Sequence, residues 1–115
     1  MTDPADTPPL EVDCQSVYAD LTSGETFLFL DCREADEHAT VAIDGAVLLP
    51  MSEIAARLDE IKPHPSRRIV VHCHHGGRSL RVARWLRDQG FPAAQSMAGG
   101  IDRWAVEIDT RLPRY

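Results

Sequence analysis

The chain has 115 residues, of which 43% are hydrophobic and 26% charged, and its formal net charge is −6. A chain of this length and composition is expected to form one soluble globular domain with a single core. The negative charge argues against nucleic acid or an anionic membrane as a partner, and the sequence shows neither a transmembrane run nor a signal peptide.

The first half of the chain alternates short apolar strands with helical segments. Residues 1–9 are polar and contain three prolines, so they are expected to form a flexible arm before a domain of residues 10–115. The apolar spacing predicts a strand at 10–12, a helix at 14–21, a buried strand at 26–31, a short helical turn at 33–39 and a strand at 46–49.

The second half continues this alternation. Ser52 is expected to cap a helix with apolar positions at 54, 58 and 61, which Pro63 and Pro65 end. The later elements are a strand at 69–72, an amphipathic helix from 79 to a stop at 90, a strand at 93–97 and a last helix opened by residues 98–100. This order predicts an α/β fold with a mainly parallel five-stranded sheet and helices on both faces. Because sites in such sheets form where strands end, residues 31–33 and 73–74 are expected to share one rim.

The most informative segment joins the strand at 69–72 to the next helix, and it reads Cys73-His74-His75-Gly76-Gly77-Arg78-Ser79. Its glycines allow a sharp turn, and successive N–H groups at a helix N-terminus bind anions. A thiol pointing into such a cradle is stabilised as a thiolate, which lowers its pKa below the ordinary value of about 8.5. A lone cysteine in an apolar strand is more often an inert buried thiol. The neighbours of Cys73 instead predict a nucleophile for anionic sulfur or phosphorus chemistry.

Three segments in this order resemble the single-domain rhodaneses, a family of sulfurtransferases. They are Asp31-Cys32-Arg33-Glu34 with Glu37 and Ile43-Asp44-Gly45-Ala46, then the loop 73–79 (Cys-x-x-Gly-x-Arg-Ser), then Gly99-Gly100-Ile101-Asp102-Arg103-Trp104 (Gly-Gly-x-x-x-Trp). The likeness spans roughly residues 10–108 and implies a rhodanese-like domain. It also implies that Cys73 takes a sulfane sulfur from a donor such as thiosulfate, holds it as a persulfide and passes it to cyanide or a thiol. No metal or organic cofactor is implied.

The other loop residues have roles that the sequence leaves open. Arg78 either pairs with an anionic donor or ties the loop to a carboxylate. Ser79 is expected to cap the following helix. Asp31 and Arg33 brace the loop, as the resemblance implies, or form a local ion pair.

The sequence also leaves the roles of the two histidines and of the other cysteines undecided. His74 and His75 either carry protons and attract anions or supply backbone while their rings face solvent, and their spacing does not favour a metal site. The three cysteines are few and widely spaced, which predicts no disulfide framework and favours a reducing cytoplasm. Cys32 is a buried apolar side chain or, if its strand neighbours that of Cys73, a resolving thiol.

Two other functions compete with an independent sulfurtransferase. A dual-specificity phosphatase or arsenate reductase would also place a cysteine and an arginine on such a loop. The spacing between Cys73 and Arg78 is one residue shorter than is usual in those enzymes. Alternatively, the domain is a persulfide carrier that docks to a cysteine desulfurase or a sulfur-incorporation enzyme. The expected partners are therefore a small anionic sulfur donor, a thiol or cyanide acceptor and, for a carrier, a sulfur-relay protein.

Overall fold

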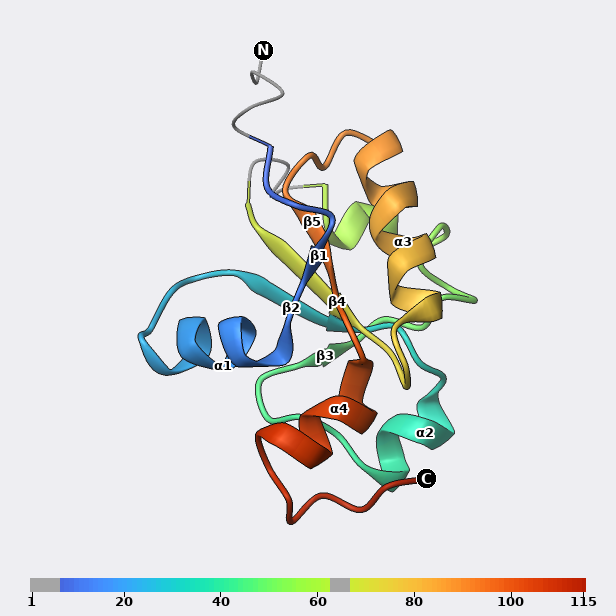
Figure 1. The fold of residues 1–115 in the computed structure, drawn as a ribbon. Coiled ribbons are helices and arrows are strands. Elements are labelled where there is room, and N and C mark those ends of the chain that lie inside the picture. Colours follow the sequence, from blue (N-terminus) through green and yellow to red (C-terminus); the bar gives the residue numbers. More distant parts are fainter. Residues whose placement is uncertain (1–6, 63–66) are drawn as a thin grey trace.

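The computed structural model describes residues 7–62 and 67–115, which form a five-stranded sheet covered by helices (Figure 1). The strands are β1 (Glu11–Val12), β2 (Leu28–Asp31), β3 (Val47–Leu48), β4 (Ile69–His72) and β5 (Ala94–Met97). They lie in the order β1-β5-β4-β2-β3, and every neighbouring pair is parallel. This confirms the predicted α/β fold and its five-stranded sheet.

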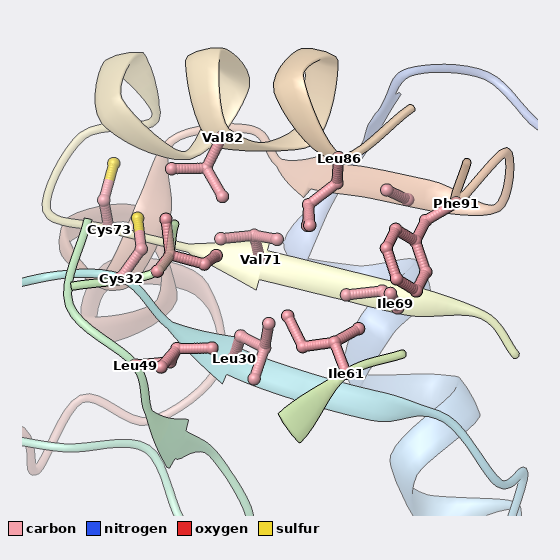
Figure 2. Close-up of a cluster of buried hydrophobic side chains, with 12 residues drawn as sticks. Leu30, Cys32, Leu49, Ile61, Ile69, Val71, Cys73, Val82, Leu86 and Phe91 are labelled. Atoms are coloured by element: carbon pink, nitrogen blue, oxygen red, sulfur yellow. The ribbon is translucent and has the colours of Figure 1, made fainter. Parts of the chain in front are cut away.

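Helices cover both faces of this sheet, as predicted. They are α1 (Cys14–Thr22), α2 (Ala35–Thr40), α3 (Gly77–Asp88), α4 (Gly100–Glu107) and the short 3-10 helix η2 (Leu58–Glu60). Since side chains alternate along a strand, Leu30 and Val71 pack on one face with α3, whereas Phe29 and Val70 pack on the other with α1 and α4 (Figure 2 shows the first cluster). All four residues of β4 are buried, which is typical of a central parallel strand.

The C-terminal ends of β2 and β4 lie next to each other. These strands are hydrogen-bonded neighbours, and Asp31 pairs with His72 in their register. The residues that follow them, 32–33 and 73–74, therefore leave the sheet at the same edge, which confirms the rim predicted from the sequence.

The segment between β3 and β4 differs from the predicted helix. Residues 51–57 form successive turns that lead into η2. Ser52 therefore has no α-helix to cap, and its hydroxyl donates a hydrogen bond to Glu34 Oε1 at 2.7 Å. Ile54 and Ile61 are still buried against the sheet, because turns can satisfy the same apolar spacing. Pro63 and Pro65, expected to end this helix, lie outside the described residues.

The expected N-terminal arm, residues 1–9, lies mostly outside the described residues, which begin at Thr7. The carbonyl oxygens of Pro8 and Pro9 accept hydrogen bonds from Arg87 Nη2 at 2.7 Å and Gln95 Nε2 at 2.8 Å. Within residues 7–62 and 67–115, none of the helices combines the length and apolar character that a bilayer crossing requires.

Candidate active site

Cys73 directly follows β4, and its side chain points toward α3 (Figure 2). The residue is 1% exposed. Its Sγ accepts hydrogen bonds from the backbone N–H groups of Gly76 at 3.1 Å and Ser79 at 3.3 Å, and the Ser79 hydroxyl lies 3.4 Å away. The loop thus surrounds the sulfur with donors, as the anion cradle predicted from the sequence requires.

The turn into α3 depends on Gly76. This residue is the N-cap of α3 with a φ of 107°, a left-handed conformation that favours glycine. The expectation that Ser79 caps the helix is therefore wrong. Because α3 already begins at Gly77, Ser79 lies within its first turn and is fully buried. Its hydroxyl makes a 2.7 Å hydrogen bond with Ser96 Oγ on β5 and lies close to the Cys73 sulfur.

The loop is held from its other side by the start of α4. The backbone N–H of Ile101 donates to the Cys73 carbonyl at 2.8 Å, and that of Asp102 donates to the His74 carbonyl at 3.0 Å. A Cβ on Gly100 would overlap both carbonyl groups, and this residue has a φ of 60°. Gly100 therefore lets α4 approach the loop closely enough to donate these two bonds.

The environment of Cys73 favours its thiolate. A hydrogen bond from the Cys32 thiol is the largest influence, and the Ser79 and Gly76 donors outweigh burial, so the pKa of Cys73 falls to about 4. The same hydrogen bond and burial raise the pKa of Cys32. At neutral pH, Cys73 is therefore the ionised member of the pair and Cys32 is the protonated one. Both are free thiols.

Arg78 forms a two-pronged ion pair with Glu37 of α2. Its Nη1 and Nη2 donate to Glu37 Oε1 and Oε2 at 2.7 and 2.9 Å. These hydrogen bonds lower the pKa of Glu37 to about 2. Of the two roles considered for Arg78, the structure shows the tie to a carboxylate. Glu37 belongs to a motif recognised in the sequence. Its pairing with Arg78 could not be predicted, because the two residues are 41 positions apart and no local pattern links them.

Asp31 and Arg33 form a fully buried ion pair beneath α2. Arg33 donates to Asp31 Oδ1 at 2.9 Å and Oδ2 at 2.6 Å, and to the Val41 carbonyl at 2.7 Å. Burial opposes ionisation of Asp31, but the Arg33 hydrogen bonds prevail and its pKa falls to about 2. Through its bond to Val41, Arg33 supports the segment that carries Glu37, and Glu37 in turn binds Arg78 of the active loop. Asp31 and Arg33 therefore form a local ion pair and also support the loop indirectly.

The aromatic ring of Tyr115 covers part of the loop, a contact that sequence reasoning did not assign. It stacks on the His74 ring with centroids 3.8 Å apart and an angle of 5° between the planes. Its hydroxyl donates to Glu37 Oε2 at 2.9 Å and accepts from Arg33 Nη1 at 2.9 Å. The tail has no apolar periodicity, so nothing in the sequence pattern pointed to this contact.

The two loop histidines differ in their surroundings. The rings of His74 and His75 stack with centroids 3.8 Å apart, but His75 is exposed, whereas His74 lies partly buried under Tyr115. Ligand atoms of these histidines and of Asp102 lie within 4.8 Å of one another, a spacing that could hold a metal ion. The Asp102 carboxylate is already bound by Arg114 at 2.9 and 3.1 Å. A cation at this position would therefore compete with that guanidinium.

The sequence and the fold were compared with those of known proteins. The sequence profile of the family described as "Rhodanese-like domain" matches residues 13–107. The chain belongs to this family. A sulfurtransferase of Allochromatium vinosum is 35% identical over 95 residues, which cover 83% of this chain and 87% of that protein. This rhodanese-like domain also resembles the solved structure of the human single domain sulfurtransferase TSTD1, with a TM-score of 0.76, 25% identity and coverage of 87% of this chain and 98% of that one.

Other relatives are longer proteins. The putative sulfur carrier protein YrkF of Bacillus subtilis is 30% identical over 99 residues, which cover 86% of this rhodanese-like domain but 52% of YrkF. The chain spans 29% of the Rhodanese-like/PpiC domain-containing protein 12 of Arabidopsis thaliana. It therefore corresponds to one part of these relatives. Together, the family and the relatives support a sulfurtransferase of the rhodanese type.

Proposed function

We propose that the protein transfers a sulfane sulfur from a small anionic donor such as thiosulfate to cyanide or a thiol, through a persulfide on Cys73. The observation that carries this proposal is the pair of backbone N–H groups at 3.1 and 3.3 Å from the Cys73 sulfur. Donors that stabilise the thiolate also suit the terminal sulfur anion of a persulfide held in the same loop.

The reaction would proceed in two displacements at sulfur. The Cys73 thiolate attacks the outer sulfur of thiosulfate, the sulfur–sulfur bond of the donor breaks, and sulfite leaves. The acceptor then attacks the outer sulfur of the persulfide, and the Cys73 thiolate is regenerated. Because the pKa of Cys73 is about 4, the residue is a better leaving group than an ordinary thiol.

The other residues of the site position this sulfur. Backbone N–H groups of the loop 74–79 would bind the transferred sulfur, and Arg78 fixes the loop through Glu37. Asp31 and Arg33 support the segment that carries Glu37. An oxyanion reaction receives less support, because Arg78 already forms two hydrogen bonds with Glu37 and would have to exchange them for a phosphate or arsenate.

A persulfide carrier fed by another protein is the second function that an observation favours. A relative is named a putative sulfur carrier protein, and Cys73 is almost fully buried, so a docking partner could open the loop when it delivers sulfur. The chemistry at Cys73 is the same in both cases. We place either reaction in a reducing compartment, the cytoplasm, because the three cysteines are free thiols and Cys73 must remain reduced between turnovers.

The test is the intact mass of the protein after incubation with thiosulfate and then with cyanide. Wild type is expected to gain one sulfur atom and to release it as thiocyanate, and Cys73→Ser is expected to gain none. Cys14→Ser is the matched control, because Cys14 is also a buried free thiol but lies in the cluster on the other face of the sheet. Absence of sulfur uptake from thiosulfate together with loading from a cysteine desulfurase would establish the carrier instead. Absence of both an added sulfur and a newly formed disulfide after incubation with either donor would refute a persulfide function.

A further inference from the structure

Cys32 and Cys73 occupy paired positions on neighbouring strands. Asp31 of β2 pairs with His72 of β4, and the backbone N–H of Cys32 donates to the His72 carbonyl at 3.0 Å, so the parallel register continues one residue further. Neighbouring strands lie about 4.8 Å apart. That spacing falls within the Cα separation of about 4.4–6.8 Å found in disulfides. The backbone therefore already holds the two cysteines at a distance that a disulfide can span.

Their side chains also lie on the same face of the sheet. Asp31 and His72 approach each other on the opposite face, with Oδ2 and Nε2 4.0 Å apart, and the alternation of side chains turns the next residues toward α3. Figure 2 shows both sulfur atoms pointing toward α3 from the ends of β2 and β4. Both residues are buried and belong to the same apolar cluster.

We propose that Cys32 is a resolving thiol, which attacks the Cys73 persulfide, releases sulfide and leaves a Cys32–Cys73 disulfide. When no external acceptor is present, the domain would release its sulfur as sulfide instead of transferring it. The inference rests on the proposed function, because it requires the persulfide on Cys73.

The position of Cys32 determines which sulfur it attacks. Cys32 stands at the paired position on the neighbouring strand, and its sulfur points toward α3 beside that of Cys73 (Figure 2), so it faces Sγ, the inner sulfur of a persulfide. The outer sulfur would extend beyond Sγ into the loop. Attack on the inner sulfur forms the Cys32–Cys73 bond and expels the outer sulfur. Attack on the outer sulfur would move the persulfide to Cys32 instead.

The step balances without an external oxidant. The Cys32 thiol and the persulfide anion of Cys73 give one disulfide and one hydrosulfide ion, and the thiol proton leaves with the hydrosulfide. The outer sulfur is reduced to sulfide, and the Cys32 sulfur is oxidised to the disulfide level. A small dithiol or two monothiols, acting by thiol–disulfide exchange, would return both cysteines to their free forms.

The test follows the fate of the sulfur in acceptor-free, anaerobic buffer after thiosulfate is removed. Wild type is expected to release one sulfide for each persulfide loaded, and peptide mapping without reductant is expected to find Cys32 linked to Cys73. Cys32→Ser and Cys32→Ala are expected to retain the sulfur on Cys73 at least about tenfold longer, since an internal thiol acts at a high effective concentration. Cys14→Ser is expected to behave as wild type, because Cys14 packs in the cluster on the opposite face.

The outcomes separate this inference from the function on which it rests. A persulfide in wild type that survives as long as in Cys32→Ser would overturn the resolving role and leave the sulfurtransferase intact. A sulfur atom found on Cys32 would also overturn it, in favour of attack on the outer sulfur. If Cys32→Ser gains no sulfur and wild type gains neither a sulfur nor a disulfide, the persulfide function itself fails, and this inference fails with it.

Discussion

The Arg78 guanidinium and the Glu37 carboxylate meet through two parallel hydrogen bonds of 2.7 and 2.9 Å, which join the active loop to α2. The side chains are 31% and 19% exposed, so the pair is only partly screened by water. Tyr115 extends this connection, because its hydroxyl bonds both Glu37 and Arg33 while its ring covers His74. The loop is thus held by side-chain contacts to two other segments as well as by its own backbone.

Glu37→Gln is expected to destabilise the protein by about 1–2 kcal/mol at neutral pH, because Arg78 loses a charged acceptor. Arg78 lowers the pKa of Glu37 from 4.5 to about 2, so this stabilisation is fully present above the unfolded-state value and is lost as the pH falls through the folded one. Urea unfolding should therefore show the difference from wild type shrinking between pH 4.5 and about 2.

Glu53→Gln is the matched control for this prediction. Glu53 pairs with Arg57 at 3.4 Å, but its side chain is 53% exposed, so its removal should change stability by less than about 0.5 kcal/mol. Equal effects of the two substitutions, or a Glu37→Gln effect that does not depend on pH, would contradict the role assigned to the Arg78–Glu37 pair.

The ionisation of Cys73 should be visible in the ultraviolet absorbance of its thiolate. The midpoint is expected near pH 4, and the signal should come from Cys73, because the pKa values of Cys14 and Cys32 are raised. Cys32→Ala and Ser79→Ala each remove a hydrogen-bond donor and should move the midpoint upward by about one pH unit. A midpoint near that of an ordinary thiol in wild type would show that the loop does not activate the sulfur.

Gly100→Ala is expected to cost about 3 kcal/mol or more and to abolish sulfur transfer. The new methyl group would overlap the carbonyls of Cys73 and His74, so α4 would have to move away from the loop. Gly24→Ala is the matched control, since Gly24 also has a positive φ, of 81°, but open space around it. It should cost about 1–2 kcal/mol from backbone strain alone and leave activity unchanged. Similar losses of stability and activity in both variants would contradict the steric argument.

The buried ring of His72 should make stability depend on pH in the mildly acidic range. Burial lowers its pKa from 6.5 to about 4, so the unfolded chain takes up a proton at a higher pH than the folded protein does. Stability is then expected to fall by roughly 3 kcal/mol as the pH decreases from 6.5 to about 4. His72→Phe removes the titrating group, and calorimetry should show a flatter pH dependence between these values. An unchanged slope would indicate that other groups cause the acid sensitivity.

Much of the fold could be predicted from sequence periodicity, because the strongest apolar runs lie where the sheet is buried on both faces. β2 and β4 lie within the predicted strands. Cys73 directly follows β4, and the Gly76-Gly77 turn that starts α3 comes three residues later. The segment after β3 was predicted as a helix because turns and a helix can bury the same positions, Ile54 and Ile61. The spacing of apolar residues indicates which residues face the core, but it does not indicate how the backbone of the segment is hydrogen-bonded.

The contacts that complete the site were harder to predict. Glu37 and Arg78 are 41 positions apart, and Tyr115 is 78 positions from Glu37, so no local pattern links them. Ser79 was expected to cap α3, but the left-handed conformation of Gly76 starts the helix earlier. By contrast, the approach of Cys32 to Cys73 could be anticipated, because it requires only that β2 and β4 be neighbours.

Because α4 donates hydrogen bonds to the loop, the environment of the Cys73 sulfur depends on a segment that is synthesised later. Ile101 and Asp102, which donate to the carbonyls of Cys73 and His74, leave the ribosome after the cysteine does. Until they dock, the loop lacks the support that fixes its N–H groups around the sulfur, and the thiol remains an ordinary one. Because domains generally fold as units, the nucleophile becomes reactive late, once the C-terminal helix is in place. The low pKa of Cys73 is therefore a property that the sulfur acquires when α4 docks, and the absorbance of its thiolate would report that this contact has formed.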